Sequence, residues 1–182
     1  QPATLNVKSN LDKLTLNDMQ VFRFNFRHEK NQKILYLHGG YNTLQPSPFH
    51  WRLLDKLTLN TLHEVVLPIY PKSPDYHYLE TFKAIRDVYN QLVEEVGANN
   101  IVMMGDGSGG GLALSFVQSL INDNQEVPRK LFLLSPLLDA TLTNPNITKT
   151  LEENDILVSR FGVHQLMKSW TNDLPLSDAR IS

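Results

Sequence analysis

The stretch that decides the fold is IVMMGDGSGGGLALSF, from Ile101 to Phe116. Its four leading apolar residues predict a buried strand, the glycine-rich segment predicts a sharp turn, and the apolar spacing that follows predicts a helix. A strand-to-helix turn of this kind can present a catalytic nucleophile at its apex. The apex here is Gly107, which has no side chain. The sequence therefore raises the question of what such a site does without a nucleophile.

Strand and helix signals alternate on both sides of this stretch. Apolar runs predict strands at residues 33–38, 64–70, 101–104 and 130–135, and phenylalanines at positions 22, 24 and 26 predict a half-buried strand. Apolar residues spaced by three or four predict helices at 78–96, after the glycine turn and at 160–170. This alternation predicts a mostly parallel or mixed sheet with helices on both faces. We expect one α/β domain over residues 1–182, with a cap-like helical segment at 150–175.

The composition narrows the possible functions. The chain has 182 residues, 17 basic and 19 acidic, with a formal net charge of −2 and no long basic run, so nothing favours nucleic acid as a partner. The absence of cysteine excludes disulfides, zinc–thiolate sites and a cysteine nucleophile. No apolar run approaches the roughly 20 residues that span a bilayer, and the first residues lack a signal-peptide pattern. We therefore expect a cytoplasmic protein without a membrane span.

Two interpretations of the glycine turn are open. Gly105, Gly107 and Gly110 satisfy G-x-G-x-x-G, which predicts a dinucleotide binder, but the next strand ends at Ser135 where that motif expects an acidic residue. The alternative is a nucleophile elbow, preceded in the chain by an H-G-G loop whose backbone N–H groups form an oxyanion hole. Both glycine clusters follow apolar strands, and ligands bind at the carboxyl ends of such strands.

The second interpretation agrees with a resemblance that extends from about Lys33 to Ser182. The segments YLHGGY, LPIYPKSPDYHYLETFKAI, MGDGSGGGLAL, LLSPLLDATLTNP and PLSDARIS resemble, in this order, segments of the hormone-sensitive-lipase type of α/β-hydrolase, which includes bacterial esterases and lipases. The resemblance implies an α/β-hydrolase fold and an ester hydrolase that uses no cofactor and no metal. It implies a small-molecule ester or another hydrophobic ligand as partner, and leaves a homodimer open.

The resemblance also assigns roles to backbone groups. The N–H groups of Gly39, Gly40 and Ser108 would form the oxyanion hole, with His38 and Asp106 supporting the loops. A single donor of this kind contributes a few kcal/mol in the transition state. The alternative, that the diglycine is only a tight turn, stays open.

Several aromatic residues near these loops allow two interpretations. Tyr41 replaces a small residue of the family and would narrow the loop. Phe49, His50 and Trp51 either line an acyl or alcohol pocket or serve as packing anchors. The polar aromatic cluster at 70–78 could be read as a metal or sugar site, although it lacks evident metal-ligand spacing and matches a structural segment of the family.

The departures from the family concern the catalytic triad. The nucleophilic serine aligns with Gly107 and the following alanine with Ser108, which could act as nucleophile only if the turn shifted by one residue. The only histidine after the elbow is His164, in the cap-like segment, and Asp139 matches a position outside the triad. The family's catalytic Asp and His lie beyond Ser182, so we expect the sequence to be part of a longer protein.

Three functions are consistent with these residues. The first is a carboxylic-ester hydrolase by ancestry, impaired because Gly107 replaces the nucleophile. The second is a non-catalytic α/β-hydrolase-fold protein that binds a ligand or a partner. The third is a dinucleotide binder that uses Gly105, Gly107 and Gly110.

Overall fold

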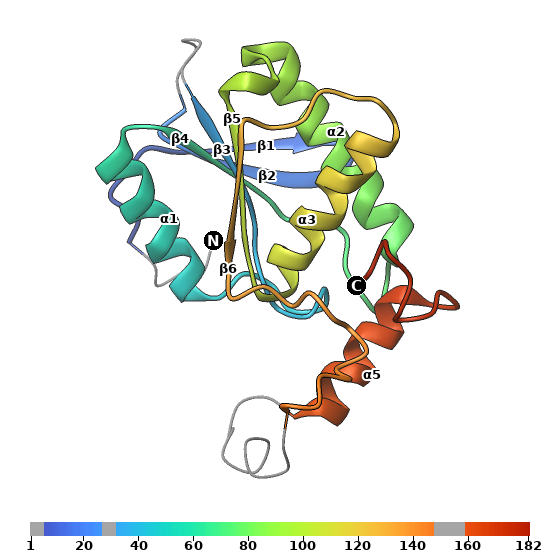
Figure 1. Ribbon diagram of the computed structural model, residues 1–182. Helices are drawn as coiled ribbons and strands as arrows, with labels where there is room; N and C mark the ends of the chain where they lie inside the picture. The colour runs from blue at the N-terminus through green and yellow to red at the C-terminus, as the bar shows by residue number, and fades with distance from the viewer. Residues whose placement is uncertain (1–5, 27–31, 148–158) are drawn as a thin grey trace.

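The computed structural model describes residues 6–26, 32–147 and 159–182 (Figure 1). Within these residues, six strands form one sheet in the order β1-β2-β4-β3-β5-β6. Strand β2 is antiparallel to β1 and β4, whereas β3, β4, β5 and β6 run parallel. The strands are β1 (Leu11–Leu16), β2 (Met19–Phe24), β3 (Lys33–Leu37), β4 (Glu64–Pro68), β5 (Ile101–Asp106) and β6 (Lys130–Leu134). The predicted mostly parallel sheet is confirmed.

Helices cover both faces of this sheet (Figure 1). The helices are α1 (Pro48–Thr61), α2 (Tyr78–Val96), the 3₁₀ turn η1 (Ala98–Asn100), α3 (Gly107–Asn122) and α5 (Arg160–Thr171). On the face covered by α1, the ring centroid of Trp51 lies 4.8 Å from that of Phe22. On the face covered by α2 and α3, the ring of Tyr89 lies 5.5 Å from that of Phe116. Strands β3 and β4 are buried along their whole length, because helices cover a parallel sheet on both sides.

Strand register brings the two glycine clusters together. In the parallel pair of β3 and β5, Leu37 lies opposite Gly105. The next residues on each strand, the H-G-G loop and the turn at Gly107, therefore leave the sheet side by side at its carboxyl edge. This proximity is what the order of the sequence motifs predicted.

The opposite, amino edge of the sheet holds a buried cluster of four charged side chains. Arg23 bonds to Glu64 and, at 2.6 Å, to Glu95. The Lys33 ammonium lies 2.9 Å from Glu64 and 2.7 Å from Glu95. Burial alone would raise the pKa of Glu95, but hydrogen bonds and charges from Arg23 and Lys33 outweigh burial and lower that pKa to about 2. Two cations and two anions thus compensate one another, and of the four only Glu95 is partly exposed.

The structure differs from the sequence predictions at three elements. Strand β1 and helix α1 were not predicted as elements, although Pro48 at the first helical position and Ser47 before it are helix-start signals. Strand β2 ends at Phe24, so Phe26 lies outside it, with its ring 4.3 Å from the Arg23 guanidinium. Strand β2 is also buried on both faces, not on one, because its alternating side chains pack into the two hydrophobic cores on opposite sides of the sheet. Of the cap-like segment at 150–175, residues 150–158 lie outside the described residues.

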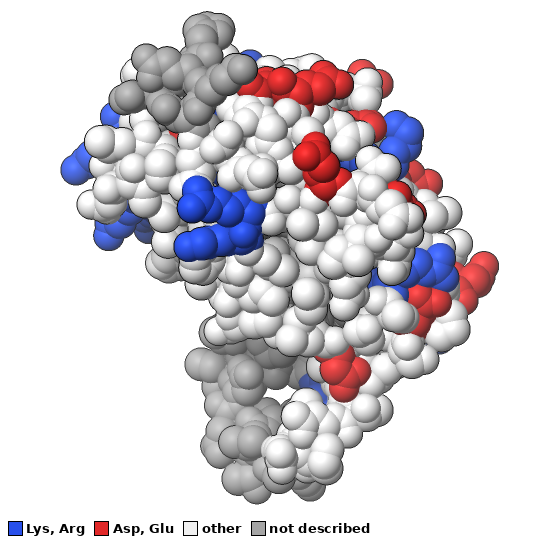
Figure 2. All heavy atoms as spheres, turned by 45° about the horizontal axis from the view of Figure 1, so that its top comes forward, with Lys and Arg blue, Asp and Glu red and all other residues white. Residues whose placement is uncertain are grey.

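The visible surface carries no extended field of one charge. Basic and acidic side chains are scattered in small groups on the face shown in Figure 2, and most of that face is neither. Among the residues that the structure describes, no helix combines the length and apolar character needed to cross a bilayer.

Candidate active site at the glycine elbow

The elbow is the turn where β5 passes into α3. Gly107 is the first residue of α3 and has a φ of +51°, a left-handed conformation that glycine adopts without strain. Two residues further, a Cβ on Gly109 would lie 2.3 Å from the carbonyl oxygen of Leu37. Glycine is therefore required at position 109 for α3 to pack this closely on β3. Position 109 thus has no space for a side chain, whereas position 107 does.

Position 107 has room for a side chain. A Cβ added there would find only one heavy atom within 4 Å, the Cα of Gly39 at 3.9 Å, which is an ordinary contact distance. A substitution would still carry the cost of the positive φ, roughly 1–2 kcal/mol for a residue other than glycine. The serine of a nucleophile elbow occupies a strained turn of this type.

The Asp106 carboxylate connects the elbow to the H-G-G loop. Its Oδ1 accepts hydrogen bonds from the Gly39 N–H at 2.9 Å and from the Tyr36 hydroxyl at 2.8 Å. Its Oδ2 lies 3.1 Å from Nε2 of His50. Burial raises the pKa of Asp106, but these hydrogen bonds outweigh burial and leave the pKa below its ordinary value. Asp106 is thus an ionised acceptor that holds the loop.

The His50 ring is oriented by the start of α1. The Ser47 N–H donates to Nδ1 of His50 at 2.9 Å, and the Ser47 hydroxyl lies at the same distance from that nitrogen. Because Nδ1 accepts, Nε2 carries the proton and donates to Asp106. Sequence analysis did not find this bond, which joins residues 56 positions apart.

His38 lies beneath the loop as a neutral ring. It is stacked on Tyr70 with ring centroids 4.7 Å apart, and its Nδ1 lies 2.7 Å from the carbonyl oxygen of Gly39. Burial, followed by the nearby charge of Lys72, lowers the pKa of His38 to about 3. The ring therefore supports the loop without carrying a charge near neutral pH.

A cavity of about 520 Å³ opens beside the elbow. Its lining includes Gly39, Gly40, Tyr41, Asp106, Gly107, Ser108, Ser135, Pro136, Leu137, Leu142, Ile147, Arg160 and Val163. Most of its walls are apolar, and they come from the segment after β6 and from α5. The Leu137 N–H donates to the carbonyl of Gly107 at 2.8 Å, which joins one wall to the elbow.

The candidate oxyanion donors are not equivalent. The Gly39 N–H is engaged by Asp106. The Gly40 N–H has no acceptor among the described residues, and the Ser108 N–H belongs to the first turn of α3, where a helix provides no acceptor. The Ser108 side chain is 4% exposed, and its hydroxyl has no partner among the described residues.

The other residues singled out in the sequence lie in different places. Tyr41 lines the elbow cavity, with a φ of +56°. Trp51 lies on the buried side of α1, against Phe22, and Phe49 is 77% exposed; neither belongs to the lining of this cavity. His164 is exposed on α5 and lines a different hollow. Asp139 accepts hydrogen bonds from the backbone of its own loop, at Thr141 and beyond.

The apolar walls were missed by the sequence analysis. Leu137, Leu142, Ile147 and Val163 carry no chemical motif, and only their position after the β6 strand and on the cap-like helix could have indicated them. Among the described residues, no group of three His, Asp or Glu side chains converges as a metal site would require.

Residues 34–182 match the family model of the alpha/beta hydrolase fold. The chain belongs to the α/β-hydrolase fold family. It is 33% identical over 153 residues to a protein named "Esterase" from Acinetobacter venetianus, a match that covers 83% of this chain and 50% of the esterase. It is 66% identical to a crystal structure described as a "putative esterase from Staphylococcus aureus", with a TM-score of 0.96 over 100% of this chain and 62% of that one.

A more distant solved structure agrees in fold alone. An esterase from the bacterial hormone-sensitive lipase family is 20% identical, with a TM-score of 0.85 over 98% of this chain and 60% of that chain. This α/β-hydrolase chain thus resembles esterases and lipases, as its motifs predicted. It spans 50% of the Acinetobacter esterase and 62% of the Staphylococcus chain.

Proposed function

We propose that the elbow cavity binds carboxylic esters with small acyl groups, and that Gly107 impairs their hydrolysis by the serine mechanism. The observation that carries this proposal is the backbone conformation and the free space at position 107. Its backbone has the positive φ of an elbow apex, and the space for a small side chain is open toward Gly39. The chain has therefore kept the geometry of a nucleophile site without the nucleophile.

An ester carbonyl oxygen would lie against the N–H groups of Gly40 and Ser108. Such donors stabilise the charge that develops on this oxygen in the transition state, and removing one costs about 3–4 kcal/mol in enzymes that use them. The Gly39 N–H has a different role in this proposal, because it donates to Asp106 and holds the loop in place. The apolar walls at Leu137 and Val163 would accept the acyl chain.

The missing hydroxyl limits what these donors can achieve. Without a serine no acyl-enzyme forms, and an oxyanion hole with binding alone leaves only residual catalysis. Ser108 does not replace it, because this residue lies in the first turn of α3, after the apex, and is buried.

A second candidate function is ligand binding without catalysis. It is favoured by the volume of the cavity, about 520 Å³, which is within the usual range of about 300–1,000 Å³ for small-molecule sites. Dinucleotide binding has less support, since Ser135 and not an acidic residue follows β6.

The test compares the full-length protein with its Gly107→Ser variant in the hydrolysis of p-nitrophenyl butyrate. We expect the glycine form to show little turnover above background and Gly107→Ser to raise kcat/KM at least a hundredfold. Gly107→Ala is the matched control, because it adds the Cβ without the hydroxyl and should stay at background. Equal turnover by the glycine and serine forms would overturn the proposal.

A further inference from the structure

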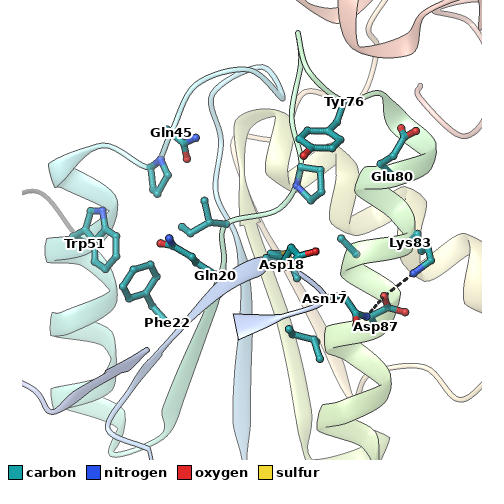
Figure 3. Close-up of a pocket in the computed structure, with 16 residues that line it drawn as sticks. Asn17, Asp18, Gln20, Phe22, Gln45, Trp51, Tyr76, Glu80, Lys83 and Asp87 are labelled. Carbon is teal, nitrogen blue, oxygen red and sulfur yellow. Dashed lines mark hydrogen bonds and ion pairs between the residues drawn. The ribbon is translucent and has the colours of Figure 1, made fainter. Parts of the chain in front are cut away.

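A second and larger cavity lies at the same edge of the sheet, apart from the elbow. It has a volume of about 720 Å³ and lies between the first turns of α1 and α2, above the turn that joins β1 to β2 (Figure 3). Its floor is apolar and includes Met19, Phe22 and Ile69. None of the residues lining it lines the elbow cavity. The function proposed above does not use it.

One wall carries an indole donor without an acceptor in the described part of the protein. The Trp51 side chain is only 2% exposed, yet Trp51 lines the cavity, and its indole N–H has no hydrogen-bond partner among the described residues. This N–H is not among the buried atoms that lack a partner, so it is open to the cavity and can donate to an oxygen bound there. The indole of the other tryptophan, Trp170, is buried and donates to the Thr81 hydroxyl at 2.9 Å.

Two amides stand near this donor. Gln20 lies on β2 and Gln45 precedes α1, and both side chains are labelled around the open space in Figure 3. Neither amide has a hydrogen-bond partner in the part of the chain that the structure describes. Each can donate and accept. The α1 side of the cavity thus offers donors and acceptors together.

The α2 side carries carboxylates, most of them already engaged. Asp87 accepts from the Lys83 ammonium at 3.0 Å and from the Asn17 amide at 2.9 Å. Glu80 accepts from the His77 N–H at 3.0 Å. Asp18 has no side-chain partner among the described residues.

The chemistry of these groups disfavours two classes of ligand and favours a third. Three carboxylates against one ammonium repel an anion. An alkylammonium ion has no lone pair, so it cannot accept from the Trp51 indole. A neutral ligand with several hydroxyl groups satisfies both requirements, since each hydroxyl donates to carboxylate or amide oxygens and accepts from N–H groups. The half-exposed ring of Tyr76 adds an apolar face at the rim.

We propose that this cavity is a binding site for a neutral sugar, with a ring hydroxyl accepting from the Trp51 indole and the amides of Gln20 and Gln45 bonding to neighbouring hydroxyls. The site is separate from the elbow and does not depend on ester hydrolysis. Gln45 lies on the segment that joins Gly40 to α1, so one segment borders both cavities.

Maltose is the probe for this site. The chain has two tryptophans, so the indole region of a ¹H–¹⁵N spectrum contains a signal for each, and Trp170 is the internal control because its N–H is already bonded. We expect maltose to shift the Trp51 indole signal saturably and to leave the Trp170 signal in place. Sodium butyrate and propylammonium chloride should shift neither.

Variants at two exposed glutamines separate the site from the general surface. Gln45→Ala should weaken maltose binding about threefold to tenfold, the effect of one hydrogen bond. Gln118→Ala, on the exposed side of α3, should change it by less than about twofold. The proposal is overturned if maltose leaves the Trp51 signal unmoved, if both indoles shift together, if butyrate or propylammonium moves Trp51 instead, or if the two variants bind maltose equally.

Discussion

The amino and carboxyl edges of the sheet differ in how their buried polar groups are paired. At the amino edge, Arg23, Lys33, Glu64 and Glu95 pair with one another, and three of the four side chains are almost fully buried. At the carboxyl edge, two cavities open, and polar atoms such as the Ser108 hydroxyl lie buried without partners. One edge satisfies its charges internally, whereas the other leaves donors for something else to satisfy.

This difference predicts which substitutions will lower stability and which will affect binding. Groups that compensate each other in the interior contribute to stability, and removing one leaves an unpaired charge. Unpartnered groups beside a cavity contribute to binding, so their removal should leave stability nearly unchanged. The following substitutions test this division, beginning with the largest expected effect.

The largest effect is expected at the amino edge from Arg23→Met. It leaves Glu64 and Glu95 to share the single cation of Lys33 in a buried site, which costs about 3–5 kcal/mol. The measurement is the free energy of unfolding in urea at pH 7. Lys83→Ala, which breaks the surface pair with Asp87, is the control and should cost less than about 1 kcal/mol. Equal losses of unfolding free energy in both variants would contradict the proposed difference between the edges.

The next largest loss of stability distinguishes two glycines of the elbow, Gly109 and Gly107. Gly109→Ala places a Cβ 2.3 Å from the Leu37 carbonyl oxygen and should destabilise the fold by about 3 kcal/mol, because α3 must move away from β3. Gly107→Ala meets only open space and the cost of a positive φ, about 1 kcal/mol. Thermal unfolding of both variants gives the order. A larger loss for Gly107→Ala would contradict the open space at position 107.

The Asp106→Asn substitution tests the polar connection at the carboxyl edge. It weakens the acceptor for the Gly39 N–H and the Tyr36 hydroxyl and should cost about 1–2 kcal/mol at pH 7. Because the folded pKa of Asp106 lies below its ordinary value, this contribution is complete above the unfolded pKa of about 4. It is lost as the pH falls through the folded pKa. Urea unfolding from pH 7 to pH 3 should show the two proteins converging, and a constant difference would contradict this.

The smallest effect concerns Glu95, which is 27% exposed. Its folded pKa of about 2 lies below its ordinary value of 4.5, so its contribution to stability is present above pH 4.5 and is lost between pH 4.5 and 2. Because water screens the partly exposed Glu95 carboxylate, Glu95→Gln should cost only about 1 kcal/mol at neutral pH and flatten the acid side of the stability profile. The exposed neighbour provides the control Glu94→Gln, which should leave the profile unchanged. Identical profiles for both variants would be the contrary result.

The sequence was sufficient to predict most of the fold. Strands β3, β4, β5 and β6 and helix α2 follow from apolar runs and from three-to-four-residue spacing, which are local properties. Strand β1 was not predicted, because LDKLTL alternates weakly and its pairing with β2 depends on a partner strand. Helix α1 was not predicted either. It has capping residues and a proline at its start, but its apolar and polar faces differ too little to form a clear apolar stripe.

The candidate site could be predicted only in part. The order of the H-G-G loop and the elbow identified Gly39, Gly40 and Gly107, because adjacent parallel strands end at one edge. The hydrogen bond of Asp106 to the His50 ring depends on how α1 packs on the sheet, which no local pattern specifies. The same packing decides that Trp51 lies in the wall of the second cavity and not beside the elbow.

The most direct test of the central claim is phosphonate labelling of the full-length protein, read by intact mass and peptide mapping. The claim is that the elbow is a nucleophile site from which only the side chain is missing. We predict that the Gly107→Ser variant gains one adduct at position 107 and that the glycine form gains none. Labelling of the glycine form at Ser108, or no labelling of a folded Gly107→Ser variant, would contradict the claim.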